Sequence, residues 1–195
     1  MAQAAQNVNV LNNPDNVKLL GNVLRTNVSA CSSIGAPFIV QIGRIYMDLL
    51  GLYRAVSELI SESVVVQGPI ATKTPRVRGM RTIKREILKL IDTYISRADD
   101  LNAVKENMIP PLLEAVLGDY NRNAEPAKDA EVLNVMSNVV ARLGAMITDK
   151  IPIILEAVFE CTLNMINKNF EEYPEHRVGF FKLLQAINQY CFPGT

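Results

Sequence analysis

A nine-residue motif occurs twice in this chain, and the spacing of its copies limits the folds that the chain can adopt. The run IPPLLEAVL at residues 109–117 reappears as IPIILEAVF at residues 151–159, with six identical positions and an offset of 42 residues. A looser third copy, PFIV, begins at Pro37. A repeated unit of this length cannot bury its apolar face alone, so neighbouring units must stack on one another.

Apolar residues recur at helical spacing along nearly the whole chain, which predicts seven helices. The first begins at Asn13-Pro14-Asp15, where Asn caps, Pro suits the first position and Asp favours the helix dipole. It ends near Gly35. The other helices begin near residues 37, 77, 109, 132, 151 and 173. The β-branched run at residues 63–66 is interpreted as a fraying helix end, because Gly68 and Pro69 follow it.

A period of about 40 to 47 residues with two helices per unit is typical of HEAT repeats. The sequence therefore predicts an all-α fold, an α-solenoid of HEAT-type antiparallel helix pairs. The predicted units span residues 13–67, 73–122, 129–168 and, incompletely, 174–192 of one segment covering residues 1–195. Since no partner helix follows the seventh helix, we expect a fragment of a longer solenoid.

Charge and cysteine content argue against several classes of protein. Twenty Lys and Arg balance twenty Asp and Glu, whereas a nucleic-acid binder needs a basic surface. Cys31, Cys161 and Cys191 are far apart, which favours a reducing compartment and small core side chains over reactive thiols. Residues 1–10 lack a targeting signal, and no stretch is apolar enough to cross a bilayer. We expect a soluble intracellular protein with no membrane insertion and no direct contact with nucleic acid.

Motifs for catalysis or metal binding are missing from the sequence. His176 is the single histidine, and no cysteine or acidic cluster with metal-ligand spacing accompanies it. Its place near a helix start predicts a partly exposed surface residue. No nucleophile elbow, dinucleotide-binding loop or P-loop motif occurs. The sequence therefore predicts a protein that is not an enzyme and that holds no cofactor.

A cluster of cations lies near the start of the third predicted helix. Its members are Lys73, Arg76, Arg78, Arg81, Lys84 and Arg85. Cations at a helix N-terminus oppose the helix dipole, so local helix stability does not explain them. Arg78, Arg81 and Arg85 share one helical face, and we take them as a candidate surface for an acidic partner. The alternative is a solvated face paired with acidic residues of neighbouring repeats.

Two glutamates occupy the same position in the two copies of the motif, Glu114 in the first and Glu156 in the second. Equivalent positions of a solenoid line up as a ladder, often on its concave face. We therefore predict that Glu114 and Glu156 form part of a protein-binding surface. Simple solvation with pairing between repeats is the alternative.

Five runs of this chain strongly resemble the exportins for leucine-rich nuclear export signals, members of the importin-β superfamily. The runs are AVFECTLNMINK (157–168), FEEYPEHR (170–177), NVKLLG (16–21), QIGRIY (41–46) and MRTIKRE (80–86). The resemblance covers essentially the whole chain, and the departures lie mainly in loops such as residues 67–73 and 123–128.

This resemblance implies a function for the longer protein. Members of the family are ring-shaped solenoids that bind Ran-GTP and a cargo signal cooperatively, and shuttle between nucleus and cytoplasm through nuclear pores, where pore proteins are further partners. This chain resembles repeats of the C-terminal half, downstream of the groove for the cargo signal. No residues here match that groove, so none of the three cysteines is taken as its reactive cysteine. The chain would set solenoid curvature and offer surface to Ran or cargo; the alternative is a passive scaffold or adaptor arm without a ligand surface.

Overall fold

The computed structural model describes residues 8–168 and 171–192, and every regular element in those ranges is helical. The predicted all-α, helical-repeat class is confirmed. The chain divides into two compact units: unit 1 comprises residues 1–99 and 123–128, and unit 2 comprises residues 100–122 and 129–195. The predicted unit 73–122 thus has residues in both, and the repeat boundaries stay predictions.

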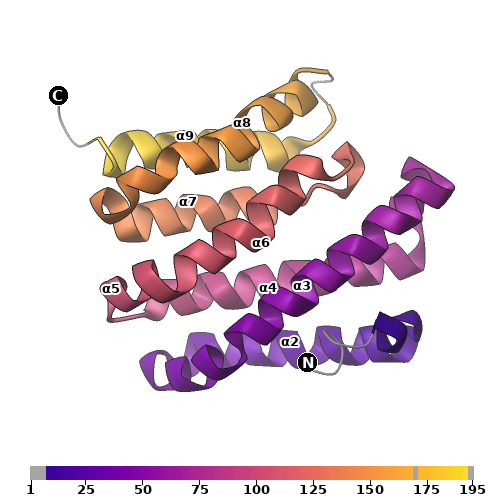
Figure 1. Cartoon of the computed structure of the whole chain (residues 1–195), viewed down its shortest axis with the longest axis horizontal. Helices are drawn as coiled ribbons and strands as arrows, with labels where there is room; N and C mark the ends of the chain where they lie inside the picture. The colour runs from indigo at the N-terminus through magenta and orange to yellow at the C-terminus, as the bar shows by residue number, and fades with distance from the viewer. Residues whose placement is uncertain (1–7, 169–170, 193–195) are drawn as a thin grey trace. The chain divides into compact units, whose positions relative to one another are not determined.

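Unit 1 contains three long helices joined by short helical turns. α4 (Pro75–Arg97) lies alongside both α2 (Pro14–Ile34) and α3 (Ile39–Gln67). Consecutive helices of this unit run in opposite directions (Figure 1). η2 (Ala36–Phe38) and η3 (Pro69–Lys73) are these turns, whereas η1 (Val8–Asn12) precedes α2 and η5 (Glu125–Ala127) follows α6 in the chain. α4 packs against both α2 and α3, and buries a stripe of apolar residues that recur at helical spacing. These are Val77, Met80, Ile83, Ile87, Leu90, Ile91 and Tyr94.

Side-chain caps and glycines set several helix ends where the sequence placed them. The side chain of Asn13 accepts a 2.9 Å hydrogen bond from the Asp15 amide, and α2 ends at Gly35 with φ 70°. Asp100, which follows α4, caps the next helical turn by accepting a hydrogen bond from the Ala103 amide at 3.0 Å. An L side chain disfavours the left-handed φ of Gly35, which explains a glycine there.

Unit 2 is built in two layers. α6 (Ile109–Arg122) packs against α8 (Ile151–Lys168), and α7 (Glu131–Leu143) packs against α9 (Pro174–Tyr190). Figure 1 shows α6 and α8 in front of α7 and α9, with consecutive helices antiparallel. Gly179 lets α9 approach α7 closely, because a Cβ at this position would lie 3.1 Å from the Cβ of Leu133. η6 (Gly144–Lys150) connects α7 to α8.

The fourth predicted helix begins earlier than expected. Helical structure starts with α5 (Leu101–Ala103) and continues through a π-helical turn, η4 (Val104–Met108), into α6. The prolines at 110 and 111 have no N–H to donate to the carbonyls four residues earlier, and their rings crowd those carbonyls. A widened turn, in which the Ile109 amide donates to the Val104 carbonyl, accommodates them. No helix of the described ranges has the length and apolar character needed to cross a membrane.

One buried hydrogen bond joins the two copies of the repeat. The hydroxyls of Tyr120 on α6 and Thr162 on α8 lie 2.8 Å apart, at a sequence separation of 42 residues. Tyr120 is 1% exposed and Thr162 is fully buried. Burial raises the pKa of the Tyr120 phenol above its ordinary value, so this residue stays neutral and able to donate. Equivalent positions of successive repeats are therefore in direct polar contact.

Replacing Tyr120 by Phe should lower the free energy of unfolding by about 1 kcal/mol, because the Thr162 hydroxyl loses a buried partner. Thr162→Val should cost a similar amount, and the double variant should cost less than the sum, since both polar groups are then gone. Urea unfolding followed by far-UV circular dichroism measures this. Tyr190→Phe, at an exposed tyrosine, is the control and should change little. Additive losses would show that the two hydroxyls are not coupled.

Candidate functional site

The two motif copies start two neighbouring helices of unit 2 at the same point. α6 begins at Ile109 and α8 begins at Ile151, the first residue of each copy. Each helix buries the matching apolar stripe. The stripe residues are Ile109, Leu112 and Val116 on α6, and Ile151, Ile154 and Val158 on α8. The repeat in the sequence is thus a repeat of packing positions.

A second face of the same two helices forms a groove of about 590 Å³. Glu114 and Glu156 both line it, and both side chains are exposed. The structure therefore brings together the two glutamates that the sequence aligned. Apolar side chains beside them, among them Leu117 and Ile153, give the groove a mixed surface. Such a surface suits the side chains of another protein better than a small ion.

Two cations in this groove were not found by the sequence analysis, Arg122 on α6 and Lys150 just before α8. Lys150 pairs with Asp149 at 3.1 Å, and this hydrogen bond lowers the pKa of the exposed Asp149 carboxyl. Neither cation has a counterpart 42 residues away, where Asn164 and Met108 stand. The repeat pattern that revealed the glutamates therefore gave no signal for the cations.

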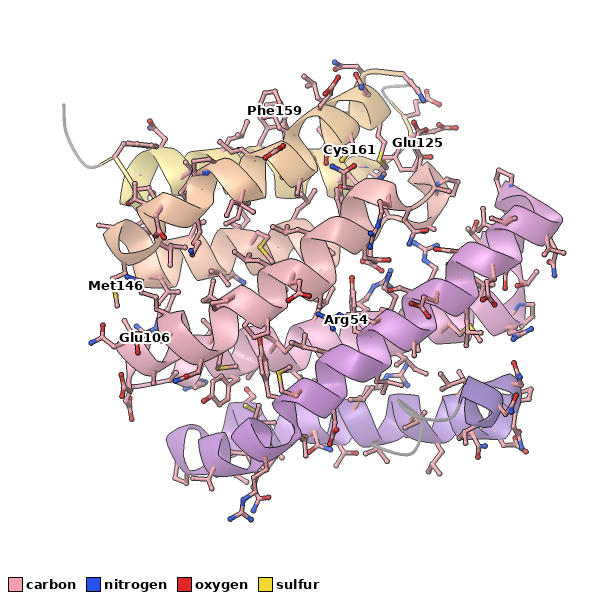
Figure 2. The ribbon with its side chains drawn as sticks, viewed as in Figure 1. Arg54, Glu106, Glu125, Met146, Phe159 and Cys161 are labelled. Atoms are coloured by element: carbon pink, nitrogen blue, oxygen red, sulfur yellow. The ribbon has the colours of Figure 1, made fainter. Side chains whose placement is uncertain are left out.

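The copies also differ at their last position. Leu117 is buried, whereas Phe159, labelled in Figure 2, is 42% exposed. The ring centroid of Phe159 lies 5.5 Å from that of Phe180. Within residues 8–168 and 171–192, no group of three or more His, Cys, Asp or Glu side chains could hold a metal ion.

The candidate surface on α4, here called the basic face, consists of Arg78, Arg81 and Arg85, and these three arginines differ in exposure. Arg78 is exposed, whereas Arg81 and Arg85 are half-buried. The Nε of Arg81 is buried and has no hydrogen-bond partner within the described residues. α4 is a continuous helix, so the three residues share a face as predicted. Their role in binding stays a prediction.

Lys84 belongs to the cation cluster in the sequence but does not lie at the surface. The residue is 2% exposed, and its Nζ lies 4.7 Å from the ring centroid of Tyr53 on α3. A cation over an aromatic face is attracted by the ring quadrupole, which stabilises the charge in this buried position.

His176 was predicted to be partly exposed and is instead buried. Its ring packs edge-on against Tyr173, with centroids 5.5 Å apart. Tyr173 precedes α9 in the left-handed conformation, with φ 57°. This local turn places an aromatic ring against the start of the helix, a contact that sequence periodicity does not predict.

The cysteines agree only in part with the prediction of three core side chains. Cys31 and Cys191 are buried, and burial raises the pKa of both thiols. Cys161, labelled in Figure 2, is only half-buried. Its thiol lies 3.4 Å from the carbonyl oxygen of Ala157. The Cys161 side chain points in a different direction from that of its fully buried neighbour Thr162, because adjacent helical residues point about 100° apart.

Comparison with known proteins places the chain in a family. Residues 41–194 match the family model described as CRM1 C terminal, which is more than half of the chain. The chain belongs to the CRM1, or exportin-1, family. This confirms the resemblance found in the sequence, and the family is one of nuclear export receptors.

Exportin-1 relatives match almost the whole chain. Exportin-1 of Schizosaccharomyces pombe is 62% identical over 193 residues, which is 99% of this chain. Exportin-1 of Drosophila melanogaster and EXPORTIN 1A of Arabidopsis thaliana are each 45% identical over 193 residues, 98% and 99% of this chain. This chain spans 18% of the length of each of these three relatives.

Arg81→Met should leave the free energy of unfolding unchanged or raise it by about 1 kcal/mol. The substitution removes a buried N–H without an acceptor and keeps an unbranched apolar stem in its place. Thermal and urea unfolding measure the change, with exposed Arg78→Met as the matched control. A clear loss of stability at position 81 alone would show that the guanidinium contributes a stabilising contact.

Proposed function

We propose that this chain is part of a nuclear export receptor that carries cargo with a leucine-rich signal out of the nucleus in a Ran-GTP-dependent complex. The supporting observation is the 62% identity with an exportin-1 over 99% of the chain. Identity of that extent covers both units. The whole receptor would bind Ran-GTP, signal-bearing cargo and nuclear pore proteins, and would shuttle between nucleus and cytoplasm.

Within that receptor, the proposed role of this segment is to set solenoid curvature and to offer surface to Ran or cargo. Stacking of equivalent helices fixes local curvature, and the buried contact between Tyr120 and Thr162 fixes the register of α6 on α8. Cooperative binding of two ligands requires a coupling free energy between their sites. Elastic strain in repeats of this kind is the proposed store for part of that energy.

The groove between α6 and α8 is the first proposed contact surface. Glu114 and Glu156 are exposed carboxylates on two helices that a buried hydrogen bond holds in register. Rigid helices present side chains to a partner with less loss of conformational entropy than loops do. Cations of a bound protein would pair with the glutamates, and its acidic groups with Arg122 and Lys150.

The basic face of α4 is the second proposed surface, and Arg78 is its exposed member. The half-burial of Arg81 and Arg85 favours the alternative role, a scaffold whose cations stabilise packing. Arg78→Glu separates the two roles. A recognition surface would lose affinity for its partner, whereas a scaffold would keep it with little loss of stability.

Calorimetric titration of the chain with Ran tests the proposed function. Ran loaded with a non-hydrolysable GTP analogue should bind, and Ran loaded with GDP should not. The double variant Glu114→Lys with Glu156→Lys should weaken binding on the order of tenfold, because each reversal replaces an attraction by a repulsion.

Glu160→Lys is the matched control, since Glu160 is exposed on the same helix but does not line the groove. If the double variant and this control bind Ran equally well, the proposed contact of Ran with the groove is excluded. A folded, monomeric chain that binds neither form of Ran would leave the segment as a curvature-setting scaffold.

A further inference from the structure

Unit 1 has a groove of its own between α2 and the first turns of α4, and Arg78, Arg81 and Arg85 of the neighbouring basic face are not among its lining residues. Its volume is about 600 Å³, within the range of about 300–1,000 Å³ common for ligand sites. Val17 and Gly21 of α2 and Gly79 of α4 contribute apolar surface. η1 forms a further wall, which is held to α2 by the 3.0 Å hydrogen bond from the Asn16 side chain to the Val10 carbonyl.

The charged residues that line this groove all carry the same sign. They are Lys18, Arg25 and Arg76, and no carboxylate of the described residues lines the groove with them. Arg25 has a weak ion pair with Glu86 at 3.6 Å. Arg76 donates a 2.6 Å hydrogen bond to the Asn12 side chain, which orients its guanidinium without neutralising the charge. The groove therefore combines an apolar floor with a cationic rim.

Among the described residues of unit 1, none packs closely enough against Gly21 to require a glycine there. It lies inside α2, where glycine costs about 1 kcal/mol relative to alanine. A Cβ at this position would meet no atom of the described residues within 4 Å, whereas one at Gly79 would lie 3.0 Å from Val17 Cγ1. Gly79 thus serves the close approach of α4 to α2. Gly21 instead keeps the groove floor open.

We propose that this groove binds an acidic linear peptide of a partner protein, with one apolar side chain seated over Gly21 and carboxylates paired with Lys18 and Arg76. Complementary charge on the rim selects the acidic partner, and the apolar floor supplies the anchor. This inference does not depend on the proposed contact with Ran, which concerns the groove of unit 2.

Fluorescence anisotropy with the whole chain and a defined probe tests the inference. The probe is a short fluorescein-labelled peptide of Asp and Glu with one central Leu. Binding should be measurable and should weaken as salt is added, because exposed charges are screened. The double variant Lys18→Glu with Arg76→Glu should weaken binding on the order of tenfold. Gly21→Leu should weaken it by a similar factor by occupying the floor.

The controls distinguish the effects of the apolar floor and the cationic rim on binding from a loss of folding and from unspecific charge attraction. Lys182→Glu, at an exposed lysine of unit 2, should leave the affinity unchanged. Gly21→Leu should stay folded by circular dichroism, since its side chain enters open space and leucine favours helix. A probe with Asn and Gln in place of Asp and Glu should bind at least tenfold more weakly, as should one with Ala in place of Leu. The inference is overturned if the acidic probe does not bind, or if affinity is indifferent to Gly21→Leu or to the Lys18 and Arg76 reversals.

Discussion

In unit 2 the phenol of Tyr120 and the hydroxyl of Thr162 lie 2.8 Å apart, and both residues are buried. A buried polar group without a partner costs more than its hydrogen bond contributes, so a slip of α6 along α8 would be penalised twice. The two apolar stripes that begin at Ile109 and Ile151 are held in register by the same constraint. The alignment of Glu114 with Glu156 in one groove follows from it, since both glutamates lie five residues after the start of their motif copy.

Much of the fold could be predicted because local signals agreed with tertiary packing. The Asn13 cap, the terminal Gly35 and the apolar stripe of α4 needed only helix periodicity and capping chemistry. The features that the sequence analysis missed depend instead on contacts and turns that helix periodicity does not encode. His176, predicted to be partly exposed, is buried beside an aromatic ring from a left-handed turn, and Lys84 is buried with its ammonium over a ring of another helix. The π-helical turn before α6 arises from two prolines whose effect depends on a helix already present on their N-terminal side.

The candidate surfaces also divide into features that a repeated sequence pattern predicts and features that it does not. The equivalent positions of Glu114 and Glu156 in the repeat predicted that the two residues would lie on one surface, because stacked repeats place equivalent residues side by side. Arg122 and Lys150 occur in one copy only, and the groove in unit 1 is shaped by the absence of a side chain at Gly21. Such features have no periodic signal. The burial of Lys84 shows the converse, that a run of cations in sequence does not make a continuous basic surface.

Membership in the exportin-1 family, a family of nuclear export receptors, gives the two grooves a context as proposed contact surfaces. Hydrogen–deuterium exchange of the chain tests this account most directly, measured alone, with Ran bound to a GTP analogue and with Ran bound to GDP. Amide exchange reports local stability segment by segment. The account predicts slower exchange in α6 (Ile109–Arg122) and α8 (Ile151–Lys168) with the GTP form only. Unchanged exchange in both helices, or equal slowing by the GDP form, would contradict it.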